Sequence, residues 1–142
     1  QNFKKANRRV HQSLLGSCLG AMFISIIVAV CGTHLLSLYT NNPDILKLGY
    51  ICLWCDALVQ PFKAANIVLT NSLRAAGDSK FPAIIGSAMM WTLGVGSALF
   101  LAFGLNLGLT GLWLGMAADE FYRSIVNYMR WRSGKWKRHG VI

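Results

Sequence analysis

The sequence predicts an all-α integral membrane protein, folded as a bundle of four transmembrane helices with both termini in the cytoplasm. Hydrophobic residues make up 54% of the 142-residue chain and charged residues only 13%, whereas soluble domains average about 25% charged residues. The mean hydropathy is +0.44. Four apolar segments are each long enough to cross a bilayer as a helix, and basic residues gather at alternate ends of these segments. Together these features indicate a membrane bundle.

The four predicted spans are joined by turns whose residues suit helix ends. Asn42 is placed to cap the second span, and Pro43 suits its first helical position. Gly77 suits the end of the same helix, and either Asp78 or Ser79 can cap the next one. The spans cover about residues 11–38, 45–75, 81–103 and 109–131, and a basic tail follows at 132–142.

The basic residues predict how the bundle is oriented. They precede the first span, flank the turn at 77–80 and follow the last span, whereas the two other turns contain only Lys47. Because loops rich in lysine and arginine stay in the cytoplasm, both termini and the 77–80 turn are expected there. The net charge of +9 is therefore a topology signal. A nucleic-acid partner is not expected, since these charges sit at span ends and not along one soluble face.

The second span has a polar stripe within an apolar helix. Counted at about 100° per residue, five polar or charged side chains fall within about 40° of one line: Asp56, Gln60, Lys63, Thr70 and Arg74. A charge at mid-bilayer costs between about 2.5 and more than 10 kcal/mol, so the stripe is expected to face protein or a water-filled cavity. Pro61 removes a backbone donor and predicts a bend. We expect the cavity to be lined by Asp56, Gln60, Lys63 and Asn66, although packing towards polar neighbours is an alternative for the Asp56–Lys63 pair.

The fourth span contains a compact charge cluster. Arg123 lies four residues after Asp119 and three after Glu120, so either acid can pair with it on one helix face. One interpretation is a neutralised structural cluster near the cytoplasmic end, because intramembrane charges usually pair. The other interpretation is a relay for a proton or an ion.

Patterns typical of an enzyme, a metal site or a cofactor site are not evident. Cys52 and Cys55 form C-x-x-C, but they lie in an apolar helix, where small thiols usually pack as hydrophobes. The histidines have no metal-ligand spacing with each other or with the cysteines, and neither a phosphate-binding loop nor a paired nucleophile and base appears. Gly16-x-x-x-Gly20 in the first span suits close helix approach, or simply gives backbone clearance.

Several ordered motifs resemble one transporter family. NSLRAAGDSKFP, then GLNLGLTGLWLG and a terminal RWRSGKWK, are similar to the C-terminal end of multidrug and toxic compound extrusion (MATE) transporters. LLSLYTNNPDILKLGY is similar to the passage between the ninth and tenth helices of the family. The resemblance implies a twelve-helix fold of two lobes in the inner or plasma membrane, in which this chain supplies about helices nine to twelve.

The same resemblance implies a secondary active antiporter that exports drugs, toxic compounds or metabolites on a sodium or proton gradient. Its partners would be the lipid bilayer, a small-molecule substrate, the coupling ion and the N-terminal helices that this chain lacks. One residue departs from the pattern, because the NorM-like branch has a membrane aspartate, taken to help coordinate sodium, where this sequence has Lys63. An ammonium group has no lone pair for a cation.

Two other interpretations stay open on the sequence. One is a truncated or structural four-helix membrane module that does not transport. The other is a freestanding small four-helix drug exporter, which is disfavoured because the first span has no acidic residue to carry a coupling proton.

Overall fold

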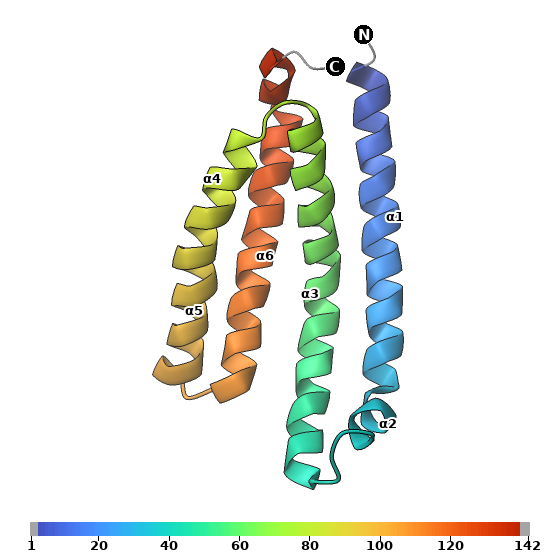
Figure 1. Ribbon diagram of the computed structural model, residues 1–142, viewed down its shortest axis with the longest axis vertical. Coiled ribbons are helices and arrows are strands. Elements are labelled where there is room, and N and C mark those ends of the chain that lie inside the picture. Colours follow the sequence, from blue (N-terminus) through green and yellow to red (C-terminus); the bar gives the residue numbers. More distant parts are fainter. Residues whose placement is uncertain (1–2, 140–142) are drawn as a thin grey trace.

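A computed structural model describes residues 3–139 as a set of helices joined by short turns (Figure 1). In chain order the elements are α1 (Phe3–Val30), α2 (Gly32–Ser37), α3 (Pro43–Ala75), α4 (Lys80–Met89), the π-helical turn η1 (Met90–Val95), α5 (Gly96–Leu99), the π-helical turn η2 (Phe100–Gly104), α6 (Gly108–Arg132) and the 3-10 turn η3 (Lys135–His139). The elements from α4 to η2 follow one another without a break. Residues 140–142 of the predicted basic tail lie outside the described residues.

Within the described residues, three helical segments are long and apolar enough to cross a membrane: Phe3–Val30, Pro43–Ala75 and Lys80–Gly104. This confirms the all-helical class and three candidate spans. α6 has 25 residues and is about 37 Å long, but it contains Asp119, Glu120 and Arg123. The four-span count therefore stays a prediction.

The long helices lie side by side in the order α1, α3, α6 and then the α4–η2 rod. α3 packs against both α1 and α6, and α6 packs against the α4–η2 rod. Both described ends of the chain lie at one end of the bundle, together with the turn between α3 and α4 (Figure 1). This arrangement places the basic-rich segments on one side, as the predicted topology requires.

The ends of α3 agree with the sequence prediction. Asn42 is the N-cap and its Oδ1 accepts a hydrogen bond of 3.0 Å from the amide of Asp44, while Pro43 occupies the first turn. Gly77 ends the turn after α3 with φ of +89°, a conformation that glycine adopts without strain. Ser79 is the N-cap residue of α4, but its side chain makes no capping hydrogen bond.

The first predicted segment differs in detail from the structure. The helix begins at Phe3, well before residue 11, and the chain turns at Cys31 before the short helix α2. Gly32 begins α2 under the side chains of α3, where an added Cβ would lie 2.6 Å from Cδ1 of Leu53. The backbone of Gly32 therefore packs closely against the side chain of Leu53.

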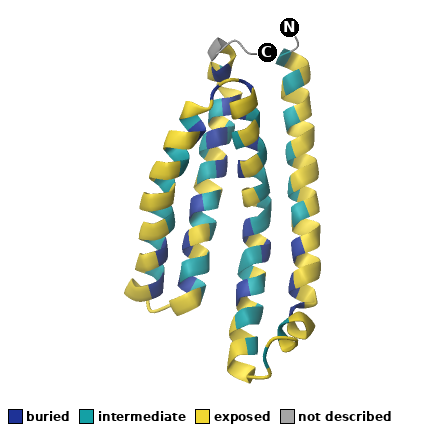
Figure 2. Ribbon diagram, viewed as in Figure 1, coloured by how far each residue is buried: buried dark blue, intermediate teal, exposed yellow. Residues whose placement is uncertain are grey.

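The best-packed part of the bundle lies at the end that carries the termini. A small core there contains Leu69, Leu73, Ala76, Trp131 and Trp136. Along most of the remaining length, large apolar side chains are exposed on the outer faces of the helices (Figure 2). Helices that expose apolar side chains on this scale are covered by lipid or by other helices in a membrane.

Close helix packing occurs at a different pair of glycines from Gly16 and Gly20. An added Cβ at either of those positions would meet no atom within 4 Å. In contrast, an added Cβ at Gly111 would lie 2.7 Å from the backbone nitrogen of Ala102, and one at Gly115 would lie 2.5 Å from that of Ala98. The hairpin of the α4–η2 rod and α6 therefore closes through small residues.

Candidate functional site

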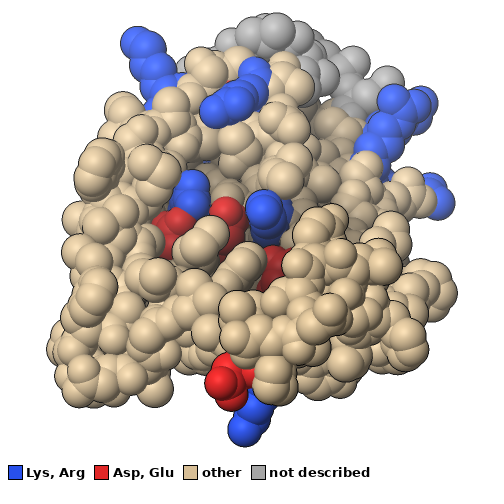
Figure 3. Space-filling model, turned by 60° about the horizontal axis from the view of Figure 1, so that its bottom comes forward, with Lys and Arg blue, Asp and Glu red and all other residues tan. Residues whose placement is uncertain are grey.

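A cavity of about 410 Å³ lies between α3, the η1–α5 region and α6. Five charged side chains line it, namely Asp56, Lys63, Asp119, Glu120 and Arg123. The rest of its wall is mainly apolar and includes Met90, Trp113 and Met116. The structure thus places the charges of the second and fourth predicted spans around one cavity. Figure 3 shows acidic and basic side chains gathered in a hollow of a face that is otherwise mainly uncharged.

The α3 side of the cavity follows from helical spacing. Asp56 and Lys63 are seven residues apart, so they lie on one face of the helix with Cα atoms about 10 Å apart along the axis. Asp56 Oδ2 accepts a hydrogen bond of 2.8 Å from Nε2 of Gln60. Gln60 therefore contacts the cavity through Asp56 and does not itself line it. Lys63 is exposed on this chain, and no ion pair within residues 3–137 involves it.

The α6 side of the cavity is an ion-pair cluster. Arg123 pairs with Asp119, four residues earlier, and its Nη2 lies 3.5 Å from Oε1 of Glu120. Asp119 is only 4% exposed. An added Cβ at Gly94 in η1 would lie 3.4 Å from Oδ2 of Asp119, so the backbone of η1 packs directly beside the carboxylate. The cluster is thus enclosed by η1 on one side and open to the cavity on the other.

A second hollow of about 500 Å³ continues from the first one, since Glu120 and Arg123 line both. Asn66 lines this second hollow and not the first. Its Nδ2 donates a hydrogen bond of 2.8 Å to Oε2 of Glu120. Its Oδ1 accepts one of 2.8 Å from Nδ2 of Asn127, which also donates to Oγ1 of Thr70 at 3.2 Å. The cluster of α6 is therefore connected to α3 by a polar network.

Three buried atoms of the network have no hydrogen-bond partner among the described residues: Asp119 Oδ1, Arg123 Nε and Asn127 Oδ1. A buried polar atom without a partner costs about 1–3 kcal/mol. Such atoms beside a cavity are suited to a polar or charged ligand that completes their hydrogen bonds.

Two parts of the site were not predicted from the sequence. Asn127 lies four residues after Arg123 and eight after Asp119, so helical spacing alone places it on the same face. The other part is η1 (Met90–Val95), a π-helical turn whose Met90, Gly94 and Val95 line the cavity. The feature of the sequence that could have indicated η1 is Gly94 within an apolar segment, because glycine inside a helix often marks a close approach of the backbone to another group.

Three of the four cysteines pack within the bundle, and Cys31 is exposed at the turn before α2. Cys52 is buried and Cys55 half-buried in α3, and both are free thiols. Cys18 of α1 donates a hydrogen bond of 3.3 Å to the carbonyl oxygen of Pro61, where α3 continues through the proline. Within the described residues, no three His, Cys, Asp or Glu side chains are arranged to hold a metal ion.

Apolar helices around a charged cavity are typical of multi-pass membrane proteins of the transporter class. The family model described as MatE matches residues 1–100, and the chain therefore belongs to the MatE family. Members of this family are transporters and not enzymes.

Individual relatives are longer than this chain. It is 33% identical over 141 residues to "Uncharacterized transporter YisQ" of Bacillus subtilis, an alignment that covers 99% of this chain and 31% of the relative. It is 29% identical over 133 residues to "Probable multidrug resistance protein NorM" of Thermotoga maritima, covering 94% and 29%. It is 25% identical over 124 residues to human "Multidrug and toxin extrusion protein 1", covering 87% and 22%. The chain thus spans about a third or less of these relatives, and no solved structure matches it.

Proposed function

We propose that this chain is the C-terminal part of a secondary active efflux antiporter and forms one wall of its central cavity. The observation that supports this most directly is the convergence of five charged side chains from α3 and α6 on one cavity with apolar walls. Apolar walls with a few converging polar groups are typical of sites for small molecules. The names of two relatives, a multidrug resistance protein and a multidrug and toxin extrusion protein, agree with export of drugs.

In this proposal α6 is the fourth transmembrane span. Its charges do not oppose insertion, because Asp119 and Arg123 face α3 and η1 and pair with each other. The bundle then has both termini and the α3–α4 turn in the cytoplasm. The twelve-helix context supplies the second lobe, and transport follows from rocking of the two lobes around the cavity between them.

The charge balance of the cavity favours a cation. Its lining contains three carboxylates and two basic groups, which sum to −1 when all are ionised. Arg123 is shared between Asp119 and Glu120, whereas Asp56 has only the neutral amide of Gln60 as a hydrogen-bond donor among the described residues. Asp56 is therefore our candidate for the carboxylate that exchanges a proton or holds a sodium ion or a cationic substrate.

The complete transporter tests this role when it is reconstituted in proteoliposomes under an ion gradient. Asp56→Asn keeps the shape of the side chain and its contact with Gln60 but removes the charge. We expect gradient-driven export to fall at least about tenfold, since an uncompensated charge in a membrane cavity is worth more than 1.4 kcal/mol. Asp44→Asn is the matched control, because Asp44 is an exposed carboxylate at the start of the same helix. Equal activity in both variants would remove Asp56 from the mechanism.

Lys63 has one of two roles in the same cavity. If its ammonium binds an anionic group of the substrate, Lys63→Met weakens export of anionic compounds and spares cationic ones. If it stands in place of a bound sodium ion, Lys63→Asp confers sodium dependence on export. Unchanged export, ion dependence and abundance of the Lys63→Met variant would instead indicate that the side chain only reaches the membrane interface.

A further inference from the structure

A separate pocket lies at the end of the bundle that carries the termini, away from the charged cavity. It has a volume of about 290 Å³ and is formed by the beginning of α1, the end of α6 and η3. Its polar lining consists of Lys4, Asn7, His11, Tyr128, Arg132 and Lys137, and we refer to it as the basic pocket. Its floor is aromatic, because the rings of Trp131 and Trp136 stack 4.4 Å apart at 9° and both are buried.

The pocket is held in place by contacts between the two ends of the chain. Trp131 Nε1 donates a hydrogen bond of 3.0 Å to Oδ1 of Asn7, and Trp136 Nε1 donates one of 2.8 Å to the carbonyl oxygen of Trp131. The ring of Phe3 meets that of Trp136 edge-on at 5.7 Å. These contacts join α1, α6 and η3, so the basic side chains project from a fixed frame.

The charges of the basic pocket have no acidic partner among the described residues. The chain has five acids, and each of them has another location. Asp56, Asp119 and Glu120 line the charged cavity, Asp44 begins α3, and Asp78 pairs with Arg130 at 2.7 Å. Within the described residues, Lys4, Arg132 and Lys137 are therefore three cations around one pocket that pair with no carboxylate, and they are suited to an anion.

An apolar groove lies below this pocket on the same face of α6. It has a volume of about 370 Å³ and is lined by Leu58 and Phe62 of α3 together with Leu114, Phe121 and Tyr122 of α6. At about 100° per residue, Leu114 and Phe121 lie within about 20° of Arg132 around the helix. Phe121 is about 16 Å from Arg132 along the axis, and the partly exposed Ile125 lies between them.

We propose that the basic pocket and the groove together bind one anionic phospholipid. Its phosphate group contacts Lys4, Arg132 and Lys137, and one acyl chain lies along α6 in the groove. Basic pockets beside transmembrane helices are suited to anionic headgroups, and tryptophan is favoured at the level of the headgroups. The groove distinguishes the lipid from free phosphate, because an inorganic anion has no part that fills it.

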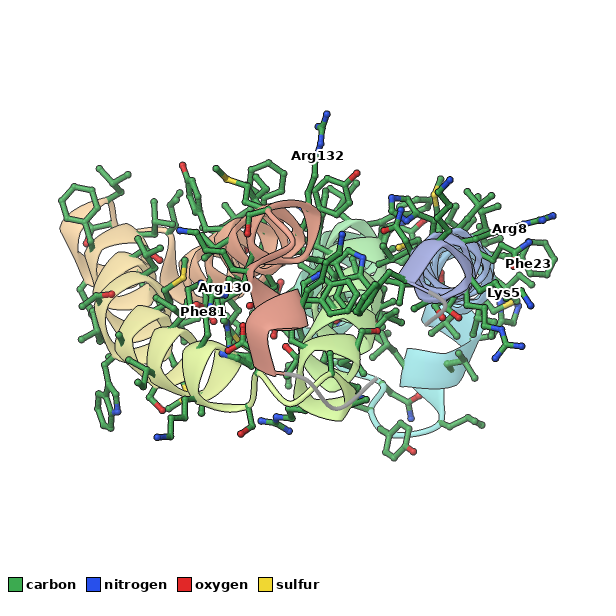
Figure 4. All side chains as sticks on the ribbon, turned by 90° about the horizontal axis from the view of Figure 1, so that it is seen from above. Lys5, Arg8, Phe23, Phe81, Arg130 and Arg132 are labelled. Carbon is green, nitrogen blue, oxygen red and sulfur yellow. The ribbon has the colours of Figure 1, made fainter. Side chains whose placement is uncertain are left out.

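The experiment measures lipid binding to the complete protein in detergent by native mass spectrometry. The probes are dioleoyl-phosphatidylglycerol, dioleoyl-phosphatidylcholine and inorganic phosphate. The pocket variant is Lys4→Gln with Arg132→Gln and Lys137→Gln. The control variant removes the same number of charges outside the pocket, with Lys5→Gln, Arg8→Gln and Lys135→Gln. Figure 4 shows Lys5 and Arg8 on the outer side of α1, pointing away from α6.

We expect the wild-type protein to bind phosphatidylglycerol at least about tenfold more tightly than phosphatidylcholine. Each basic contact near the headgroups raises the affinity for an anionic lipid about fivefold. The affinity for phosphatidylglycerol should therefore fall about 100-fold in the pocket variant and less than about threefold in the control variant. If the triple variant does not fold, the single Lys137→Gln substitution should still cost about fivefold. Leu114→Trp fills the groove, so it should weaken the binding of phosphatidylglycerol and leave any binding of inorganic phosphate unchanged.

Three results would overturn the proposal. Equal losses in the pocket and control variants would mean that general positive charge attracts the lipid. Equal binding of phosphatidylglycerol and phosphatidylcholine would mean that the phosphate contacts carry no selectivity. Inorganic phosphate that binds as tightly as phosphatidylglycerol and displaces it would mean that the pocket serves a free anion.

Discussion

In the hairpin of the α4–η2 rod and α6, two glycine-to-alanine substitutions should have opposite effects on the stability of the protein. Alanine in place of glycine inside a helix normally stabilises by about 0.5–1 kcal/mol, because the unfolded chain loses freedom. Gly96 in α5 has helical φ and ψ of −61° and −50°, and an added Cβ there meets no atom within 4 Å. Gly96→Ala should therefore stabilise the protein by about that amount. Gly115 is helical too, but its added Cβ would lie 2.5 Å from the backbone nitrogen of Ala98.

Because a backbone atom cannot rotate away as a side chain can, Gly115→Ala must push α5 from α6. Overpacking of this kind costs about 1–3 kcal/mol. The two variants should therefore differ by about 1–3 kcal/mol, which is a factor of about 5–150 in the unfolding equilibrium. Unfolding by sodium dodecyl sulfate in mixed micelles, followed by circular dichroism, measures the difference. Equal stability of Gly115→Ala and Gly96→Ala would refute close backbone packing in this hairpin.

Other predictions concern the end of the bundle that carries the termini. Asp78→Asn should lower stability by about 1.5–3 kcal/mol in the same unfolding assay, because it weakens a charged hydrogen bond to Arg130. Arg130 also stacks 4.5 Å over the ring of Phe81. An unchanged unfolding midpoint would contradict this role of Asp78. Figure 4 shows Arg130 next to that ring. Trp131→Phe keeps the aromatic floor but removes one hydrogen-bond donor, so it should cost only about 0.5–1.5 kcal/mol, and a larger loss would mean that ring shape matters more. A single cysteine at Ser79 should react with a membrane-impermeant thiol reagent only in inside-out vesicles, and labelling from the external side would exclude the four-span topology.

Much of the fold could be predicted from the sequence because membrane helices follow local rules. Apolar length, the cap at Asn42 and the stop at Gly77 depend on neighbouring residues only, and all three agree with the structure. The spacing of Asp119, Glu120 and Arg123 likewise predicted ion pairs that form within one helix. Such features require no knowledge of which helices are neighbours.

The features of the fold and site that the sequence did not predict depend on tertiary packing. Asn66 lies about 80° around the helix from Asp56, so it faces α6 and the second hollow and not the first cavity. Gly16 and Gly20 have the spacing of a packing motif, but an added Cβ at either would meet no atom of the described residues within 4 Å, whereas Gly111 and Gly115 face Ala102 and Ala98 across a tight hairpin. Sequence spacing identifies small residues, and only the arrangement of the helices decides which of them are in contact.

We infer that α3 presents its charged face to a water-filled cavity inside the membrane. A cysteine at position 63, in a background without other cysteines, tests this claim when it is treated with a charged, water-soluble methanethiosulfonate reagent. Because only the thiolate reacts and it forms only in contact with water, Lys63→Cys should be modified rapidly. Leu58, which is 70% exposed, lies on another side of the same helix among apolar side chains. Leu58→Cys should react at least about tenfold more slowly when lipid or another helix covers that side. Modification at position 63 should be fast, and a bound substrate should slow it. Equal, slow modification at both positions would contradict a water-filled cavity.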